Sequence, residues 1–76
     1  MTPYKNLSGN SNVESYEIGA DSITVKFMSG RWTHYLYSTQ RPGAAVVEQM
    51  KSLAQQGRGL NSYIGRVVKT NFERKW

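Results

Sequence analysis

The chain has 76 residues, a formal net charge of +5, one histidine and no cysteine. This length allows one domain, and the composition excludes a disulfide framework, a thiolate metal site and a metal site built from histidines. No apolar run approaches the roughly 18 residues of a membrane span. Residues 1–12 lack the charged start and apolar stretch of a signal peptide, so we expect a cytoplasmic protein that binds neither a membrane nor a cofactor.

The positive charge is concentrated in the C-terminal half of the chain. Residues 1–40 contain three basic and three acidic side chains, whereas residues 41–76 contain seven basic and two acidic ones, which leaves +5. This asymmetry favours an anionic partner, either a nucleic acid or an acidic protein surface. The same excess is also common in small soluble proteins, where it serves solubility alone.

The strands are predicted from a period of two in the apolar residues. Residues 1–12 are rich in Asn, Ser, Gly and Thr without a period, so we predict a flexible N-terminal arm followed by a single domain over residues 13–76. Residues 13–18, 23–28 and 31–37 alternate as strands do. A turn at Gly19-Ala20-Asp21 and a two-residue loop at Ser29-Gly30 would join them as a β-meander.

The two turns together predict the register of the meander. The first turn pairs Ile18 with Ile23, and the Ser29-Gly30 loop pairs Phe27 with Trp32. The apolar side chains then gather on one face of the sheet, which would comprise Tyr16, Ile18, Ile23, Val25, Phe27, Trp32 and Leu36. The opposite face would expose Lys26, Arg31, Thr33, Tyr35 and Tyr37.

Two helices are predicted after the meander. Pro42 suits the first turn of a helix, the apolar residues of 46–54 recur at helical spacing, and Gly57 is a natural C-terminal stop. A second apolar stripe runs from Leu60 to Phe72. We therefore predict an α+β fold, a three-stranded antiparallel β-meander followed by two short α-helices packed on one face of the sheet.

Catalysis is not predicted. His34 is the single histidine, and the predicted register places it on the core side opposite Val25, where a buried, hydrogen-bonded role is commoner than a catalytic one. General acid–base chemistry would need a second positioned group, and no acid in the sequence forms an obvious pair with His34. No nucleophile-elbow pattern surrounds any serine, so we predict a protein that is not an enzyme.

Two segments are candidates for binding. In the run Gly57-Arg58-Gly59, the glycines and the following helix start could expose N–H groups to an anion, or they could simply cap one helix and link it to the next. On the sheet, Tyr35 and Tyr37 beside Lys26 and Arg31 are typical of surfaces that stack bases and hold phosphates. The same residue types also occur in ordinary strand pairs and in protein interfaces.

The order of these features resembles the KTSC domain, a family named after a C-terminal extension of some lysyl-tRNA synthetases. The resemblance covers roughly residues 11–70 and is most specific in the segment Gly57-Arg58-Gly59-Leu60-Asn61-Ser62-Tyr63-Ile64. Gly57, Gly59 and Asn61 are the family-like positions there. The family's Tyr-x-Tyr corresponds to Tyr35-Leu36-Tyr37, or, two residues earlier, to Thr33 and Tyr35. The resemblance implies RNA binding by association with a tRNA synthetase.

The sequence therefore predicts a small non-catalytic nucleic-acid-binding module, with RNA ahead of DNA as the ligand. The alternative is a protein-interaction adaptor or inhibitor, of the kind found in phage or defence systems, that uses the same Tyr- and Arg-rich surface. The predicted nucleic-acid-binding residues are Lys26, Arg31, Tyr35, Tyr37, Arg58, Arg66 and Lys69.

Overall fold

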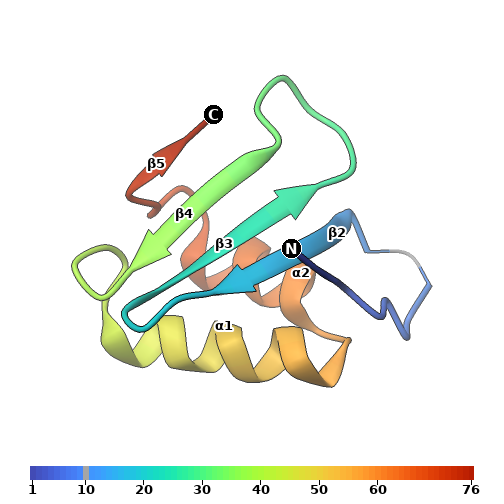
Figure 1. Cartoon of the computed structure of the whole chain (residues 1–76), viewed down its shortest axis with the longest axis horizontal. Coiled ribbons are helices and arrows are strands. Elements are labelled where there is room, and N and C mark those ends of the chain that lie inside the picture. The colour runs from blue at the N-terminus through green and yellow to red at the C-terminus, as the bar shows by residue number, and fades with distance from the viewer. Residues whose placement is uncertain (10) are drawn as a thin grey trace.

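Alternating apolar and polar residues form the three long strands at the centre of the sheet, β2 (Val13–Ile18), β3 (Ser22–Phe27) and β4 (His34–Ser38). The computed structural model, which describes residues 1–9 and 11–76, adds a two-residue strand on each side, β1 (Thr2–Pro3) and β5 (Arg74–Lys75). The strands lie in chain order, each antiparallel to its neighbours (Figure 1). The predicted α+β class and antiparallel meander are confirmed, but the sheet has five strands rather than three.

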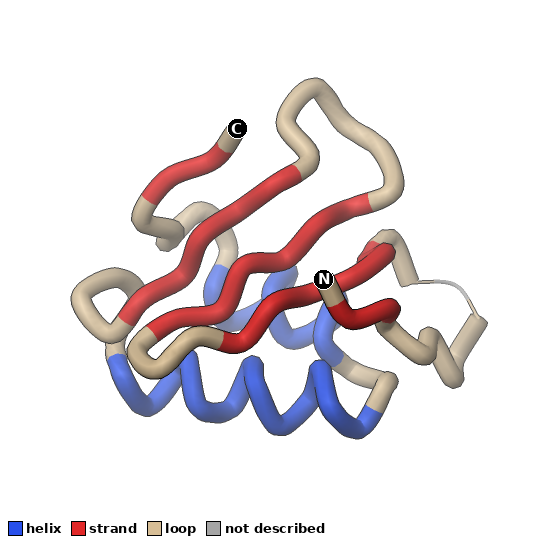
Figure 2. Tube along the Cα trace, in the orientation of Figure 1, coloured by secondary structure: helices blue, strands red, loops and turns tan. Residues whose placement is uncertain are grey.

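The helices pack against one face of this sheet. They are α1 (Ala44–Gln56), α2 (Leu60–Tyr63) and the π-helical turn η1 (Ile64–Val68), which continues α2. Figure 2 shows these helices in blue on the same side of the red strands. The other face of the sheet is not covered by any helix in the described part of the chain. The protein therefore has an inner face that forms the core and an outer, open face.

The register between β2 and β3 is the predicted one. Tyr16 pairs with Val25 and Ile18 with Ile23, and the Gly19 N–H donates to the Ser22 carbonyl at 2.8 Å to close the turn. Tyr16, Ile23 and Val25 are buried, as the alternation predicts. Ile18 lies at the end of its strand and stays 38% exposed, so of this residue pair Ile23 alone belongs to the core.

The predicted register between β3 and β4 is wrong by one residue. Val25 pairs with Tyr35 and Ile23 with Tyr37, because the connection is a longer loop that closes where the Phe27 N–H donates to the Thr33 carbonyl at 2.8 Å. Side chains alternate along a strand, so a shift of one residue moves every side chain of β4 to the other face. Tyr35 and Tyr37 therefore face inward. The predicted inward residues Trp32 and Leu36 are 42% exposed and half-buried, respectively.

The longer loop has its own anchor outside the hairpin. The Met28 N–H donates to the Asn12 carbonyl at 2.8 Å, and the Ser29 hydroxyl donates to the Asn12 side-chain oxygen at 3.1 Å. These contacts hold Ser29-Gly30 in a wide loop instead of a two-residue turn. The prediction of a two-residue turn rests on Gly30 alone. It could not take the contacts with Asn12 into account, because Asn12 lies before the first strand of the meander.

The first helix follows its predicted pattern closely. Val47, Met50 and Ala54 are buried on the face toward the sheet. The helix begins at Ala44, so Pro42 precedes it instead of lying in its first turn. Gly57 ends the helix in the left-handed conformation, with φ 80°, and its N–H donates to the carbonyls of α1.

The second helical segment is shorter than predicted. It ends at Val68, and the predicted helical residue Phe72 lies beyond it, in the stretch that leads to β5. Lys69 has φ 53° and ψ −122°, which no helix can contain. The Asn71 N–H donates to the Val68 carbonyl at 3.0 Å, which closes a turn at Lys69. This turn reverses the chain and allows β5 to pair with β4.

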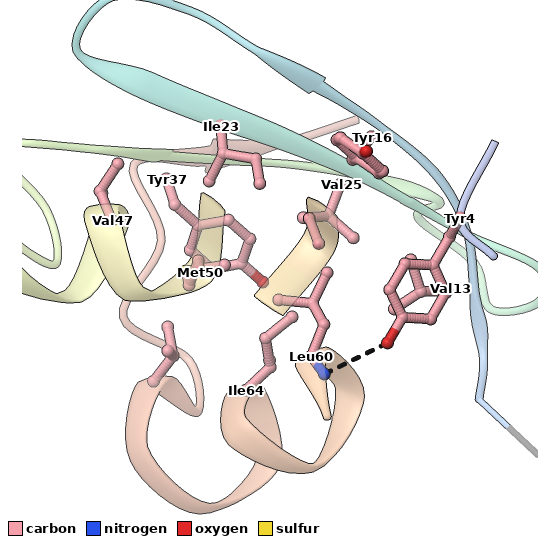
Figure 3. Close-up of a cluster of buried hydrophobic side chains, with 12 residues drawn as sticks. Tyr4, Val13, Tyr16, Ile23, Val25, Tyr37, Val47, Met50, Leu60 and Ile64 are labelled. Atoms are coloured by element: carbon pink, nitrogen blue, oxygen red, sulfur yellow. Dashed lines mark hydrogen bonds between the residues drawn. The ribbon is translucent and has the colours of Figure 1, made fainter. Parts of the chain in front are cut away.

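Residues in the predicted N-terminal arm form part of the domain. Tyr4 is only 6% exposed, and its hydroxyl accepts a hydrogen bond from the Leu60 N–H at 3.3 Å (Figure 3). The Leu7 N–H donates to the Gly57 carbonyl at 2.8 Å. The prediction of a loose arm over residues 1–12 is thus corrected for this segment, since one aromatic residue among polar ones gives no periodic signal. Asn10 lies outside the described residues.

The core lies between the inner face of the sheet and the helices. Figure 3 shows Tyr37 pointing from the sheet toward the helices, close to Met50 and Ile64. Tyr37 is 1% exposed and is the largest fully buried side chain among the described residues. A position that the sequence assigned to the surface is therefore central to the core.

Because Tyr37 is buried, we predict that the protein loses stability in alkaline solution. Burial, and to a smaller extent the neighbouring Tyr35, raises the pKa of the Tyr37 phenol above its ordinary value of 10.0. The unfolded chain releases this proton near pH 10, and the folded protein only at higher pH. This contribution to stability is therefore fully present below about pH 10 and is lost as the pH rises further. We expect the urea midpoint of unfolding to fall from about pH 10 to 11, and to fall less in Tyr37→Phe. An equal fall of the urea midpoint in the native protein and in Tyr37→Phe would contradict the assignment of this pH dependence to Tyr37.

Candidate nucleic-acid interface and aromatic pocket

The open face of the sheet presents a stacked group at its C-terminal edge. The His34 and Trp76 backbones exchange two hydrogen bonds, of 3.0 and 2.9 Å, and this pairing places the two rings side by side. The rings stack with centroids 5.4 Å apart and an interplanar angle of 12°. The Arg74 guanidinium lies 5.2 Å from the centroid of the Trp76 indole. We call Arg74, Trp76 and His34 the C-terminal ladder.

The C-terminal ladder is accessible to a ligand. Trp76 is 45% exposed, and Arg74 is exposed as well. No salt bridge is found for Arg74 among the described residues, which contain two salt bridges, Lys26–Glu14 at 2.9 Å and Lys51–Glu48 at 3.2 Å. An aromatic surface beside a cation without an acidic partner can stack a base and attract a phosphate.

The predicted sheet-face residues divide between the two faces. Lys26 lies on the open face, paired with His34, but its ammonium is bound to Glu14. Arg31 is exposed in the β3–β4 loop, with its guanidinium 5.6 Å from the centroid of the Trp32 ring. Tyr35 and Tyr37 face the core, so the prediction that they lie on the open face is wrong for the register reason given above. Their place on that face is taken by His34 and by Trp76, which directly follows β5.

The segment Gly57-Arg58-Gly59 has a structural role. Both glycines have left-handed φ values, 80° and 83°, and a Cβ at Gly57 would lie 2.6 Å from the Lys5 Cβ. The first N–H of α2, that of Leu60, is already bonded to Tyr4, and α2 has only four residues. The structure therefore favours the capping interpretation over an anion site here.

The remaining predicted cations do not join the C-terminal ladder. Arg58 and Arg66 are exposed in the helical layer, in the α1–α2 link and in η1, whereas Trp76 pairs with His34 at the edge of the sheet. Asn61 is exposed on α2. Lys69 lies at a separate site, a pocket on the inner side of the sheet.

This pocket has a volume of about 360 Å³, at the lower end of the range for small-ligand sites. It lies between the end of the β3–β4 hairpin and the turn that follows η1. Five of its lining residues are aromatic, and Tyr35 packs edge-on against Phe27 and Phe72 with centroids 5.2 and 5.0 Å apart. The lining residues are Asn12, Phe27, Ser29, Gly30, Trp32, Tyr35, Tyr37, Ile64, Lys69, Thr70, Phe72 and Lys75.

Lys69 occupies a strained position at this pocket. Its dihedral angles are close to those of the first central residue of a type II′ turn, which is usually a glycine. A non-glycine residue held in a rare backbone region costs roughly 1–3 kcal/mol and is common at ligand sites. The preceding turn is π-helical, which is also common at functional sites. Two local irregularities therefore adjoin the same pocket.

The His34 side chain contacts an aromatic ring and a hydroxyl group. The His34 ring stacks on Trp76, and its Nδ1 lies 3.1 Å from the Thr33 hydroxyl. The predicted place of His34 on the core side is wrong, because it pairs with Lys26 on the open face. Among residues 1–9 and 11–76, no three His, Cys, Asp or Glu side chains are close enough to share a metal ion.

The candidate residues that the sequence analysis does not single out lie in β5 and directly after it. Side chains alternate between the faces of the sheet along β5 and into Trp76, which directly follows it, so that Arg74 and Trp76 point outward and Lys75 lines the pocket. The signal was present in the run of two cations and a tryptophan at the C-terminal end. It was hidden because a helix was expected up to Phe72.

Comparisons of the chain with protein-family models, with curated proteins and with solved structures find no match. The resemblance to the KTSC domain therefore stays a prediction that rests on the residues quoted for it. In the described part of the chain, no helix has the length and apolar character needed to cross a membrane.

Proposed function

We propose that this protein is a non-catalytic binding module for single-stranded nucleic acid, with RNA ahead of DNA. The observation that supports it best is the C-terminal ladder, in which His34 and Trp76 stack at 12° beside the Arg74 guanidinium on the open face of the sheet. A sheet face with exposed aromatic rings and cations suits unstacked bases and their phosphates. RNA is placed first because of the resemblance to a domain found on tRNA synthetases.

The charge distribution supports the same ligand. All of the excess charge lies in residues 41–76, and this segment supplies both Arg74 and Trp76. The cations steer the ligand from a distance, and the stacked rings hold it at close range. In this proposal, Trp76 and His34 take the base-stacking role on the open face that the sequence analysis assigned to Tyr35 and Tyr37.

The test is binding of a fluorescent single-stranded RNA by the native protein and by Trp76→Ala over a range of salt concentrations. Loss of one stacking surface should weaken binding by about 1–3 kcal/mol without much change in the salt dependence. Trp76→Phe, which keeps a ring, should restore part of the affinity.

Two arginine variants provide a matched comparison. Arg74→Gln should reduce the slope of log K against log salt by about 0.7, the value for one phosphate on a single strand. Arg58→Gln removes the same charge from the helical side and should have a smaller effect. Equal losses in the two variants, without any effect of Trp76→Ala, would reduce the interaction to non-specific attraction. No binding to RNA at about 50 mM salt would refute the proposal and favour a protein partner.

A further inference from the structure

We propose that the aromatic pocket between the β3–β4 loop and the Lys69 turn binds a mononucleotide, with the base between its aromatic walls and the phosphate at Lys69 and Lys75. This site is separate from the C-terminal ladder. Lys75 points inward from β5 into the pocket, whereas Arg74 of the same strand and the following Trp76 point outward.

The walls of the pocket suit a flat ring. Phe27, Tyr35 and Phe72 form a continuous edge-to-face series, and Trp32 adds an exposed indole at the mouth. Edge-to-face packing fixes the orientation of each ring, so the walls exist before the ligand arrives. A planar base can stack there irrespective of its identity, because every base has a π-face.

The polar groups of the pocket suit an anion attached to that ring. Two lysines line the pocket, and none of the described lining residues is an aspartate or a glutamate. The Lys75 ammonium lies 5.4 Å from the centroid of the Phe72 ring, which positions it beside the aromatic wall. Lysine binds phosphate as a compact point charge with three donors.

Hydroxyl and amide groups supply hydrogen bonds for the sugar and the base edge. Thr70, Ser29 and Asn12 all line the pocket. The hydrogen bonds found among side chains of the described residues involve neither the Tyr35 nor the Tyr37 hydroxyl. Both tyrosines line the same pocket, and these phenols can bond to a ligand there.

Lys69 gives the independent reason to assign a ligand to this site. A glycine would relieve the turn, since φ 53° with ψ −122° is a glycine conformation. A lysine at this position lowers the stability of the fold and places an ammonium at the pocket. A residue that costs stability where it stands is expected at a binding site.

The first experiment measures binding of uridine monophosphate by NMR titration of the native protein, with uridine and ribose 5-phosphate as partial ligands. We expect saturable binding of the nucleotide, at least about 10-fold tighter than of either fragment, with shifts at Trp32, Lys75 and Phe72. Equal binding of uridine and the nucleotide, or no saturable binding, would overturn the proposal.

The second experiment separates strain from charge at one position. Lys69→Gly should raise the melting temperature by about 4–8 °C, the shift expected for relief of about 1 kcal/mol in a domain of this size, and should weaken nucleotide binding about 10-fold. Lys69→Gln should weaken binding similarly without the gain in stability. Arg58→Gln, which removes an equal charge outside the pocket lining, should leave binding within about twofold. Unchanged nucleotide affinity in both Lys69 variants would refute the site, and a lower melting temperature in Lys69→Gly would refute the strain argument.

The two sources of the nucleotide can be told apart. A free mononucleotide should bind whether or not the ladder is intact, so Trp76→Ala should leave its affinity unchanged. If the pocket instead holds the end of a bound strand, a short RNA with a 5′-phosphate should bind more tightly than the same RNA without it, and Lys69→Gln should abolish that difference. RNA binding without nucleotide binding would refute the pocket and leave the function of the ladder intact.

Discussion

Tyr37→Ala is expected to destabilise the protein by about 3–5 kcal/mol, the range for removal of a large buried aromatic side chain. Tyr37 is 1% exposed and packs between the sheet and the helices. A domain of 76 residues has a total stability of about 4–11 kcal/mol at typical values per residue, so this variant should be partly unfolded at room temperature. Urea denaturation followed by far-ultraviolet circular dichroism measures the change.

A comparison with Trp32→Ala makes this experiment a test of the register. Trp32 is 42% exposed in the structure, and its removal should cost below about 1 kcal/mol. The register predicted from a two-residue loop would bury Trp32 and expose Tyr37, so it predicts the opposite order. A larger loss for Trp32→Ala than for Tyr37→Ala would overturn the pairing of β3 with β4 described here.

Tyr4→Ala is the second variant with a large expected effect, also about 3–5 kcal/mol. The side chain fills the space between β2 and α2, and its hydroxyl is the hydrogen-bond acceptor for the buried Leu60 N–H. Tyr4→Phe keeps the ring but leaves this N–H without a partner, which should cost about 1–3 kcal/mol. The two variants together separate packing from hydrogen bonding.

Leu7→Ala serves as the control for the N-terminal segment. Leu7 is 64% exposed, so removal of its side chain should change stability by less than about 0.5 kcal/mol, while its backbone bond to Gly57 is kept. If Tyr4→Ala were as mild as Leu7→Ala, the first residues would be the loose arm that their composition suggests.

The predictable part of this fold consists of elements with a strong local pattern. The β2–β3 hairpin and α1 follow from periods of 2 and 3.6, and Gly57 ends its helix as a glycine usually does. The fold class follows from the order of these elements.

The parts that could not be predicted depend on contacts between distant residues. The β3–β4 register is set by a loop anchored to Asn12 and by the pairing of His34 with Trp76, and neither contact leaves a trace in the sequence near the loop. Both registers bury two large side chains of β4, so hydrophobicity could not choose between them. The prediction of which β4 residues lie on the open face was wrong for the same reason. A register shift of one residue decides whether the two tyrosines or His34 face outward.

The bond between Tyr4 and Leu60 joins residues 56 positions apart in the chain. Synthesis proceeds from the N-terminus. The strands β2, β3 and β4 can therefore pair soon after they are made, because each pairs with the next strand in the sequence. Tyr4 has no place to pack until α2 has been made, and β5 can pair with β4 only after η1 has been made. Long-range closure of this kind slows folding compared with local contacts. We therefore expect the nascent chain to expose Tyr4 until α2 has been synthesised.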